Sequence, residues 1–103
     1  MKHKDKITIV GSNMIDLVSY LNRTPEKGET VFGRAFQQGF GGKGSNQAVM
    51  AALLGADVSM ITAVGDDAYG KEWLTHYKEE NIHTEGVQVI PSNTSGVAAI
   101  WVE

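Results

Sequence analysis

The chain has 103 residues, a net charge of −3 and no cysteine. Its length suits one domain or part of one, and the lack of cysteine excludes a disulfide scaffold, a thiol nucleophile and a cysteine-ligated metal. Lysine and arginine are scattered, which argues against a nucleic-acid partner, and no segment approaches the roughly 20 apolar residues that a membrane-spanning helix needs. We therefore expect a cytoplasmic protein with no nucleic-acid or membrane partner.

The first part of the chain predicts a strand followed by a hairpin. Residues 7–10 are β-rich and run into Gly11, which predicts a buried strand that ends in a loop. Residues 17–21 predict a second strand, residues 24–29 are rich in turn formers, and residues 30–38 predict a return strand. We expect this hairpin to project from the core rather than to form a layer of it.

The rest of the chain alternates helices and strands. A glycine cluster at residues 39–45 precedes a predicted helix at residues 46–54, which Gly55 ends. The later predicted elements are a strand at residues 57–64, a helix capped by Asp66 or Asp67 with an apolar stripe of Tyr69, Trp73 and Tyr77, a strand at residues 87–90, a loop at residues 91–96 and a last strand from Gly96. This order is typical of a parallel α/β sheet.

The last predicted strand, residues 97–103, has no turn or partner strand after it. An unpaired apolar strand edge promotes aggregation. We therefore expect the chain to be part of a longer protein.

The glycine cluster has two phosphate-related interpretations, and both are weak. Gly39, Gly41 and Gly44 fit the letters G-x-G-x-x-G of a dinucleotide fingerprint, but that fingerprint opens the first βα turn, and the first strand here ends at residues 11–13. A P-loop fails at two positions, because Gln37 stands at its first glycine and Gly44 at its Ser/Thr.

A third interpretation is a site for a hydroxylated ligand such as a sugar. Glycines let the backbone approach a ligand closely, and the start of the following helix offers free N–H groups and a positive dipole end. Lys43 and Asn46 add hydrogen-bond donors. A plain glycine turn before a packed helix explains the same composition, so the cluster alone leaves both interpretations open.

Four motifs in order carry a resemblance to a known family. They are GSNMID at residues 11–16, PxxGET at residues 25–30, GGKGSNQA at residues 41–48 and VGDDxxG at residues 64–70. The whole chain resembles the ribokinase branch of the ribokinase-like (PfkB) carbohydrate kinase family. The third motif is the most specific, whereas the fourth is interpreted as structural.

The resemblance implies an α/β fold in which a parallel sheet flanked by helices carries a small β-sheet lid, of which this chain is the amino-terminal portion. It assigns residues 1–16 and 39–94 to the core and residues 17–38 and 95–103 to the lid. In the family the lid covers the sugar and forms a dimer interface, so we expect a homodimer. An exposed sheet edge gives a physical reason to dimerise.

The resemblance also implies a sugar site in which Asp16 accepts hydrogen bonds from ring hydroxyls, as a carboxylate can from two at once. The expected sugar-binding residues are Asn13, Met14, Asp16, Gly41, Gly42, Lys43, Gly44, Ser45, Asn46, Ala98 and Ile100. Many family members have asparagine where this chain has Met14, and a thioether cannot donate a hydrogen bond. Either Asn13 or a water supplies the missing contact, or the pocket tolerates its loss, so the exact sugar stays open.

The implied activity is phosphate transfer from ATP to the 5-hydroxyl of D-ribose, with Mg²⁺ and an activating K⁺. The family's base aspartate and its ATP and metal sites lie in later segments, so we expect no catalytic or metal-binding residue in this chain. His3, His76 and His83 lack ligand spacing and are interpreted as surface residues. We expect these 103 residues alone not to turn over ATP.

Other functions remain open at this point. Another pentose, deoxyribose or a nucleoside would also suit a kinase of this type, and Met14 is the residue that leaves this choice open. A non-catalytic sugar-binding or dimerisation module is a further alternative. A dinucleotide-dependent oxidoreductase is the weakest.

Overall fold

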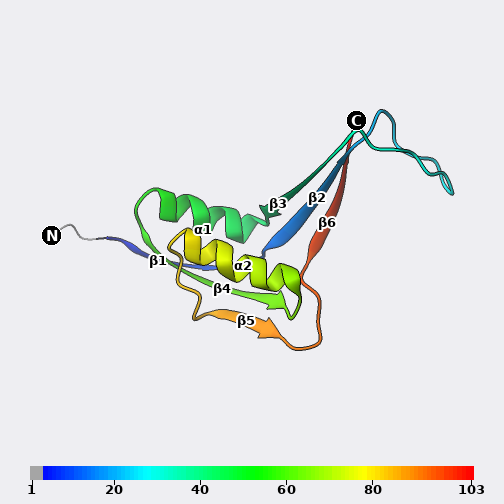
Figure 1. Ribbon diagram of the computed structural model, residues 1–103. Helices are drawn as coiled ribbons and strands as arrows, with labels where there is room; N and C mark the ends of the chain where they lie inside the picture. The colour runs from blue at the N-terminus through cyan, green and yellow to red at the C-terminus, as the bar shows by residue number, and fades with distance from the viewer. Residues whose placement is uncertain (1–3) are drawn as a thin grey trace.

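A computed structural model describes residues 4–103, and these residues form two sheets at opposite ends of an elongated molecule of 59 × 31 × 18 Å (Figure 1). The core sheet is parallel, in the order β1 (Lys6–Val10), β4 (Asp57–Gly65) and β5 (Val87–Ile90). The predicted α/β fold class, with a parallel sheet, flanking helices and a second small sheet, is confirmed.

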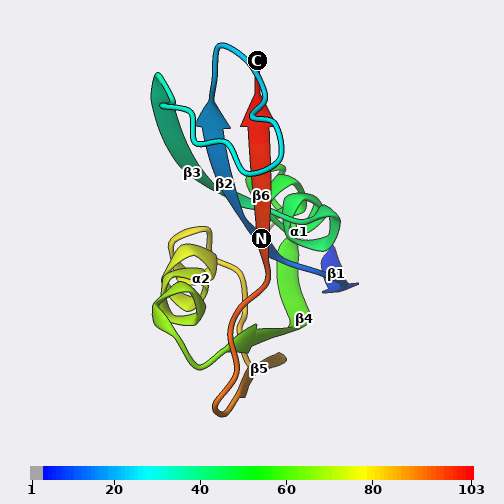
Figure 2. The ribbon, with the colours of Figure 1, turned by 90° about the vertical axis from the view of Figure 1, so that its right-hand side faces the viewer.

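Two helices connect these strands and lie on one face of the core sheet (Figure 2). They are α1 (Lys43–Leu53) and α2 (Ala68–Glu79). Both crossovers therefore have the same hand, as the general preference of parallel connections for one hand leads us to expect. No helix within residues 4–103 is long and apolar enough to cross a membrane.

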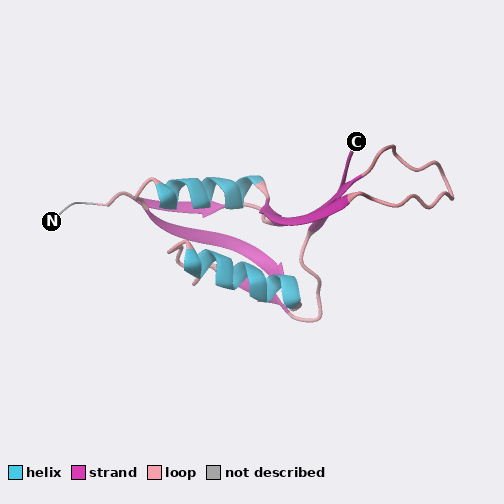
Figure 3. Ribbon diagram, turned by 45° about the horizontal axis from the view of Figure 1, so that its top comes forward, coloured by secondary structure: helices cyan, strands magenta, loops and turns pink. Residues whose placement is uncertain are grey.

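The second sheet, called the lid sheet below, extends beyond the helices (Figure 3). Its central strand is β2 (Met14–Tyr20), which pairs antiparallel with β3 (Ala35–Gly41) and parallel with β6 (Val97–Val102). The strand from Gly96 is thus confirmed as a partner of the early hairpin. The division of the whole chain into core and lid residues stays a prediction.

One apolar core joins the two sheets. Trp73 and Tyr77, one helical turn apart on α2, are fully buried, as the predicted stripe requires. Ile15 of the lid sheet is also fully buried and belongs to the same core cluster. The other buried members of that cluster are Ala48, Val58, Met60, Val64 and Ile82.

The predicted bounds of the hairpin strands were wrong. β2 begins at Met14 rather than at residue 17, and β3 lies at Ala35–Gly41 rather than at residues 30–38. Strand pairing explains the difference, because the register joins Met14 to Gly41 and Tyr20 to Ala35. Glycines that look like a turn in the sequence are held extended by hydrogen bonds to a neighbouring strand.

Helix α1 also begins earlier than predicted, at Lys43 rather than at residue 46. Gly42 precedes it with φ of 93°, a backbone conformation that glycine adopts without strain. The helix ends as expected before Gly55, which has φ of 97°.

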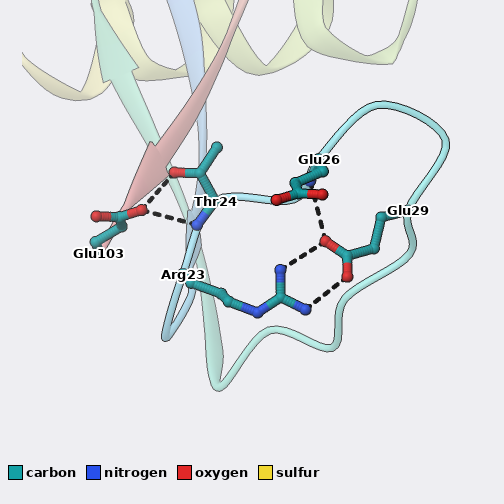
Figure 4. Close-up of polar contacts among 5 residues, drawn as sticks. All are labelled: Arg23, Thr24, Glu26, Glu29 and Glu103. Carbon is teal, nitrogen blue, oxygen red and sulfur yellow. Dashed lines mark hydrogen bonds and ion pairs between the residues drawn. The ribbon is translucent and has the colours of Figure 1, made fainter.

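Polar contacts order the loop at the far end of the lid sheet (Figure 4). Arg23 makes two hydrogen bonds of 2.6 Å to the carboxylate of Glu29, and the guanidinium holds the pKa of Glu29 below its usual range. Glu103 accepts hydrogen bonds from the hydroxyl of Thr24 at 2.6 Å and from its N–H at 2.7 Å. The two bonds to Glu103 fasten the loop to the end of β6.

Candidate functional site

Asp16 lies on β2 where the lid sheet meets the core. Its backbone is paired with Gly39 on one side and with Ala98 on the other. A Cβ atom at Gly41 would lie 2.5 Å from Oδ2 of Asp16, so the half-buried carboxylate occupies the space that a side chain at Gly41 would fill. The glycine thereby leaves the carboxylate in place beside the start of α1.

Two more glycines bring the start of α1 against the loop after β1. A Cβ at Gly42 would lie 2.7 Å from Cα of Asn13, and one at Gly44 would lie 2.7 Å from Cα of Gly11. The N–H of buried Ser45 donates a 3.0 Å hydrogen bond to the carbonyl oxygen of Ser12. This packing holds the first turn of α1 beside the chain that leads into β2.

Lys43 and Asn46 are exposed in that first turn. The positive end of the α1 dipole and these two donors lie at the end of the core that faces the lid sheet (Figure 1). Donors on α1 and an acceptor on β2 are a combination that suits a ligand rich in hydroxyl groups.

Ala98 and Ile100 complete one face of the lid sheet. They are directly opposite Asp16 and Val18 in the parallel register, so their side chains share the face of Asp16, and both are half-buried. Met14, two residues before Asp16, is on this face as well.

Asn13 and Met14 have different surroundings. Asn13 is buried, and its Nδ2 donates to Oγ1 of Thr62 at 2.9 Å and to the carbonyl oxygen of Ala63 at 3.1 Å. The Asn13 amide nitrogen therefore bonds to β4. The sulfur of Met14 packs near Gly96, 3.2 Å from where a Cβ of that residue would be.

The predicted site residues therefore fall into two sets. Those on the face or at the mouth of the site are Met14, Asp16, Gly41, Gly42, Lys43, Asn46, Ala98 and Ile100. Asn13, Gly44 and Ser45 are buried beneath them in the packing of α1 on the loop. Contact of either set with a ligand stays a prediction.

A polar network around Asp67 joins the start of α2 to the loop that leads into β6. Oδ1 of Asp67 accepts from the N–H of Gly70 at 2.8 Å and from the hydroxyl of Ser95 at 2.8 Å, and Oδ2 accepts from the N–H of Ser95 at 2.8 Å. The same hydroxyl accepts from the N–H of Gly65 at 2.9 Å. These hydrogen bonds, those from Ser95 above all, hold the pKa of Asp67 below its usual range.

The cap was predictable and the network was not. The sequence indicated Asp66 or Asp67 as the helix cap, and the structure assigns the cap to Asp67. Its bonds to Ser95 also fix the loop that leads into β6, the strand that carries Ala98 and Ile100. Nothing in local spacing links residues 28 positions apart.

The interpretation of His76 as a surface residue was wrong. Its ring is half-buried and stacks on Phe40, with centroids 4.0 Å apart and planes at 3°. The exposed ring of His83 contacts Asp57 at 2.7 Å, whereas His3 lies outside the described residues. Within residues 4–103, no group of three His, Cys, Asp or Glu side chains is arranged to hold a metal ion.

Residues 4–103 match the family described as pfkB family carbohydrate kinase. The chain belongs to that family. The resemblance inferred from the sequence is thus confirmed.

The chain is similar over most of its length to proteins named ribokinase and deoxyribokinase. It is 48% identical over 96 residues to a ribokinase of Lactococcus lactis and 46% identical over 96 residues to a deoxyribokinase of Salmonella typhimurium, covering 92% and 93% of this chain. A solved structure of Arabidopsis thaliana ribokinase complexed with ribose and ATP is 27% identical, with a TM-score of 0.85 over 96% of this chain.

The chain spans about a third of the length of these relatives. It covers 32% of the Lactococcus ribokinase, 31% of the Salmonella deoxyribokinase and 32% of the Arabidopsis ribokinase chain. The activity of the whole protein is therefore a matter for proposal.

Proposed function

We propose that this chain is the amino-terminal, sugar-binding part of an ATP-dependent kinase that phosphorylates D-ribose at its 5-hydroxyl. The observation that carries the proposal is the position of Asp16, whose carboxylate lies over Gly41 at the junction of the lid sheet and α1. The ribose and ATP complex of the Arabidopsis relative supports both ligands.

The chain's own residues would bind and orient the sugar. Asp16 would accept from two ring hydroxyls, and Lys43 and Asn46 would donate to sugar oxygens from the start of α1. Ala98 and Ile100 would cover the apolar face of the ring. Such positioning is the greater part of what phosphoryl transfer asks of a protein.

The remaining parts of the reaction belong to segments beyond this third of the protein. We propose that the base aspartate and the sites for ATP, Mg²⁺ and K⁺ lie there, and that residues 1–103 alone do not turn over ATP. A ribose-dependent release of ADP by the purified chain would contradict this.

Titration calorimetry with D-ribose tests the sugar site. Asp16→Ala should weaken binding by at least about 10-fold, because a hydrogen bond to a charged group contributes roughly 1.5–3 kcal/mol. Asp66→Ala is the matched control, since Asp66 is an exposed carboxylate outside the site and its loss changes the net charge equally. Equal affinities of the two variants would refute the role of Asp16.

A deoxyribose kinase is the second candidate, and Met14 is the observation that favours it. Its thioether lies on the face of Asp16, packed near Gly96, where it cannot donate to a hydroxyl. A sugar that lacks the 2-hydroxyl loses nothing at such a position. The 46% identity to the Salmonella deoxyribokinase supports a deoxyribose kinase about as well as the 48% identity to the Lactococcus ribokinase supports a ribose kinase.

Met14→Asn separates the two sugars. An amide that can donate and accept should strengthen binding of D-ribose relative to 2-deoxy-D-ribose by about 5-fold, the value of roughly one hydrogen bond. If the unaltered chain prefers deoxyribose and Met14→Asn reverses that order, the natural substrate is the deoxy sugar. An unchanged ratio would mean that Met14 does not face the sugar.

We also propose a homodimer formed through the lid sheet. Phe36 on β3 and Trp101 on β6 are both opposite Ser19, so they share one face of the sheet, where they are 64% and 60% exposed. Large apolar side chains grouped on an exposed face are typical of an interface. A non-catalytic dimerisation or sugar-binding module would use the same face, and the kinase assay of a longer chain distinguishes the two.

A further inference from the structure

Phe40 joins the lid sheet to α2. Its ring stacks on His76 with centroids 4.0 Å apart and meets the edge of Trp73 at 4.8 Å with an interplanar angle of 63°. Trp73 is fully buried, whereas Phe40 is 39% exposed. The ring of Phe40 therefore lies at the rim of the core, between a strand of the lid sheet and a helix of the core.

A second contact lies beside the first. Gln38 is two residues before Phe40 on β3 and so points to the same face, and its Nε2 donates to Oε2 of Glu72 at 3.2 Å. Glu72 and His76 are one turn apart on α2. Two successive inward residues of the strand thus contact one stripe of the helix.

The support matters because β3 is an edge strand. In the order β3–β2–β6 it has one neighbouring strand, and its chain turns into α1 at Gly42, where φ is 93°. β2, in contrast, is anchored by Ile15, which is fully buried in the core. The contacts of Phe40 and Gln38 join the β3 edge to α2 beside this glycine junction.

We propose that the stack of Phe40 on His76 sets the orientation of the lid sheet on the core, and thereby places Asp16, Ala98 and Ile100 opposite Lys43 and Asn46. Phe40 and His76 are positioning residues, since they act on a ligand only through the sheet. The consequence for sugar affinity rests on the proposed function, whereas the consequence for lid orientation does not.

The expected effect on affinity follows from the fraction of molecules with the correct orientation. The observed dissociation constant equals the intrinsic one divided by that fraction, so a fall of the fraction to about a tenth weakens binding about 10-fold. Phe40→Leu, which keeps an apolar side chain but removes the ring, should produce a weakening of this order. Phe40→Tyr, which keeps the ring, should retain the sugar affinity of the unaltered chain.

Single-molecule energy transfer reports lid orientation directly. The chain has no cysteine, so Ala35→Cys at the start of β3 and Lys78→Cys on α2 can carry the two dyes, both at exposed positions. Phe40→Leu should broaden or shift the transfer-efficiency distribution. Phe32→Leu is the matched control, because Phe32 is 96% exposed in the loop before β3.

His76→Leu gives a second route to the same result, since it removes the stacking partner at a half-buried helix position. Far-ultraviolet circular dichroism confirms that each variant is folded. An unchanged transfer distribution in both folded variants would overturn the proposal. If the distribution broadens but the unaltered chain binds no D-ribose, the sugar-binding proposal fails while the orienting role of Phe40 stands.

Discussion

Gly44 lies where α1 passes closest to the loop after β1. A Cβ there would be 2.7 Å from the Cα of Gly11, a backbone atom that cannot turn aside. Gly44→Ala should therefore lower the free energy of unfolding by about 1–3 kcal/mol, the usual effect of overpacking. Urea unfolding of the variant measures the change.

Gly39→Ala is the matched control for this prediction. Nothing lies within 4 Å of a Cβ at Gly39, and its backbone is extended within β3. Alanine there should be neutral or slightly stabilising, since it restricts the unfolded chain. Equal destabilisation by both variants would show that the close approach at Gly44 has no energetic weight.

Tyr77 carries a hydroxyl group into the core. The oxygen is buried and has no hydrogen-bond partner among the described residues. Burial raises the pKa of the phenol, an effect that the nearby side chains of Ser45 and Asn13 partly oppose without a hydrogen bond of good geometry. Tyr77→Phe should leave stability unchanged or raise it by up to about 1 kcal/mol, because it removes an unsatisfied polar atom.

Thermal unfolding checks this, with Tyr77→Ala as the comparison that removes the buried ring. The alanine variant should lose roughly 3–5 kcal/mol. A destabilisation by Tyr77→Phe of the size of a buried hydrogen bond would mean that the hydroxyl has a partner, such as a bound water.

At the scale of elements, Asp67 couples the start of α2 to the loop that precedes β6. Because hydrogen bonds lower the pKa of its carboxyl in the folded state, the ionised form stabilises the fold. That stabilisation is complete above the ordinary aspartate pKa of about 3.9 and is lost as the pH falls through the lower folded value. Asp67→Asn should therefore lower Tm at pH 7, and the difference should shrink as the pH falls below about 3.9.

Asp66→Asn is the control for this pH dependence. Asp66 is the exposed neighbour, and its backbone N–H donates to the carbonyl oxygen of Asn93. Calorimetric scans at pH 7 should give a smaller loss of Tm for this variant than for Asp67→Asn, because the Asp66 side chain does not link α2 to the loop before β6. A Tm difference for Asp67→Asn that does not depend on pH would contradict the role of its charge.

At the scale of the whole molecule, dimerisation through the lid sheet predicts that the protein in solution has twice the mass of one chain. Trp101→Glu and Phe36→Glu place a charge on the exposed apolar face, and burying an unpaired charge in an interface is costly. Sedimentation velocity should show a dimer for the unaltered chain and a monomer for either variant. Met50→Glu, at an exposed position on α1, should leave the dimer intact.

Most of the fold class could be predicted from local pattern. The strand at residues 57–64, the aromatic stripe of α2 and the glycine after α1 all follow from the spacing of neighbouring residues, and the structure has each of them. The four motifs were enough to identify the pfkB family, because they are read in order along the chain.

Four features could not be predicted in this way. They are the bounds of β3, the space for the Asp16 carboxylate over Gly41, the bonds of Asp67 to Ser95 and the stack of Phe40 on His76. Each joins segments that are far apart in sequence, so it depends on strand register and on the packing of helices against sheets. Local propensity and motif spacing predict the elements and the motif residues. The free energy of long-range pairing and burial fixes where those elements end and which side chains meet, and in this chain it brings Asp16 to the start of α1.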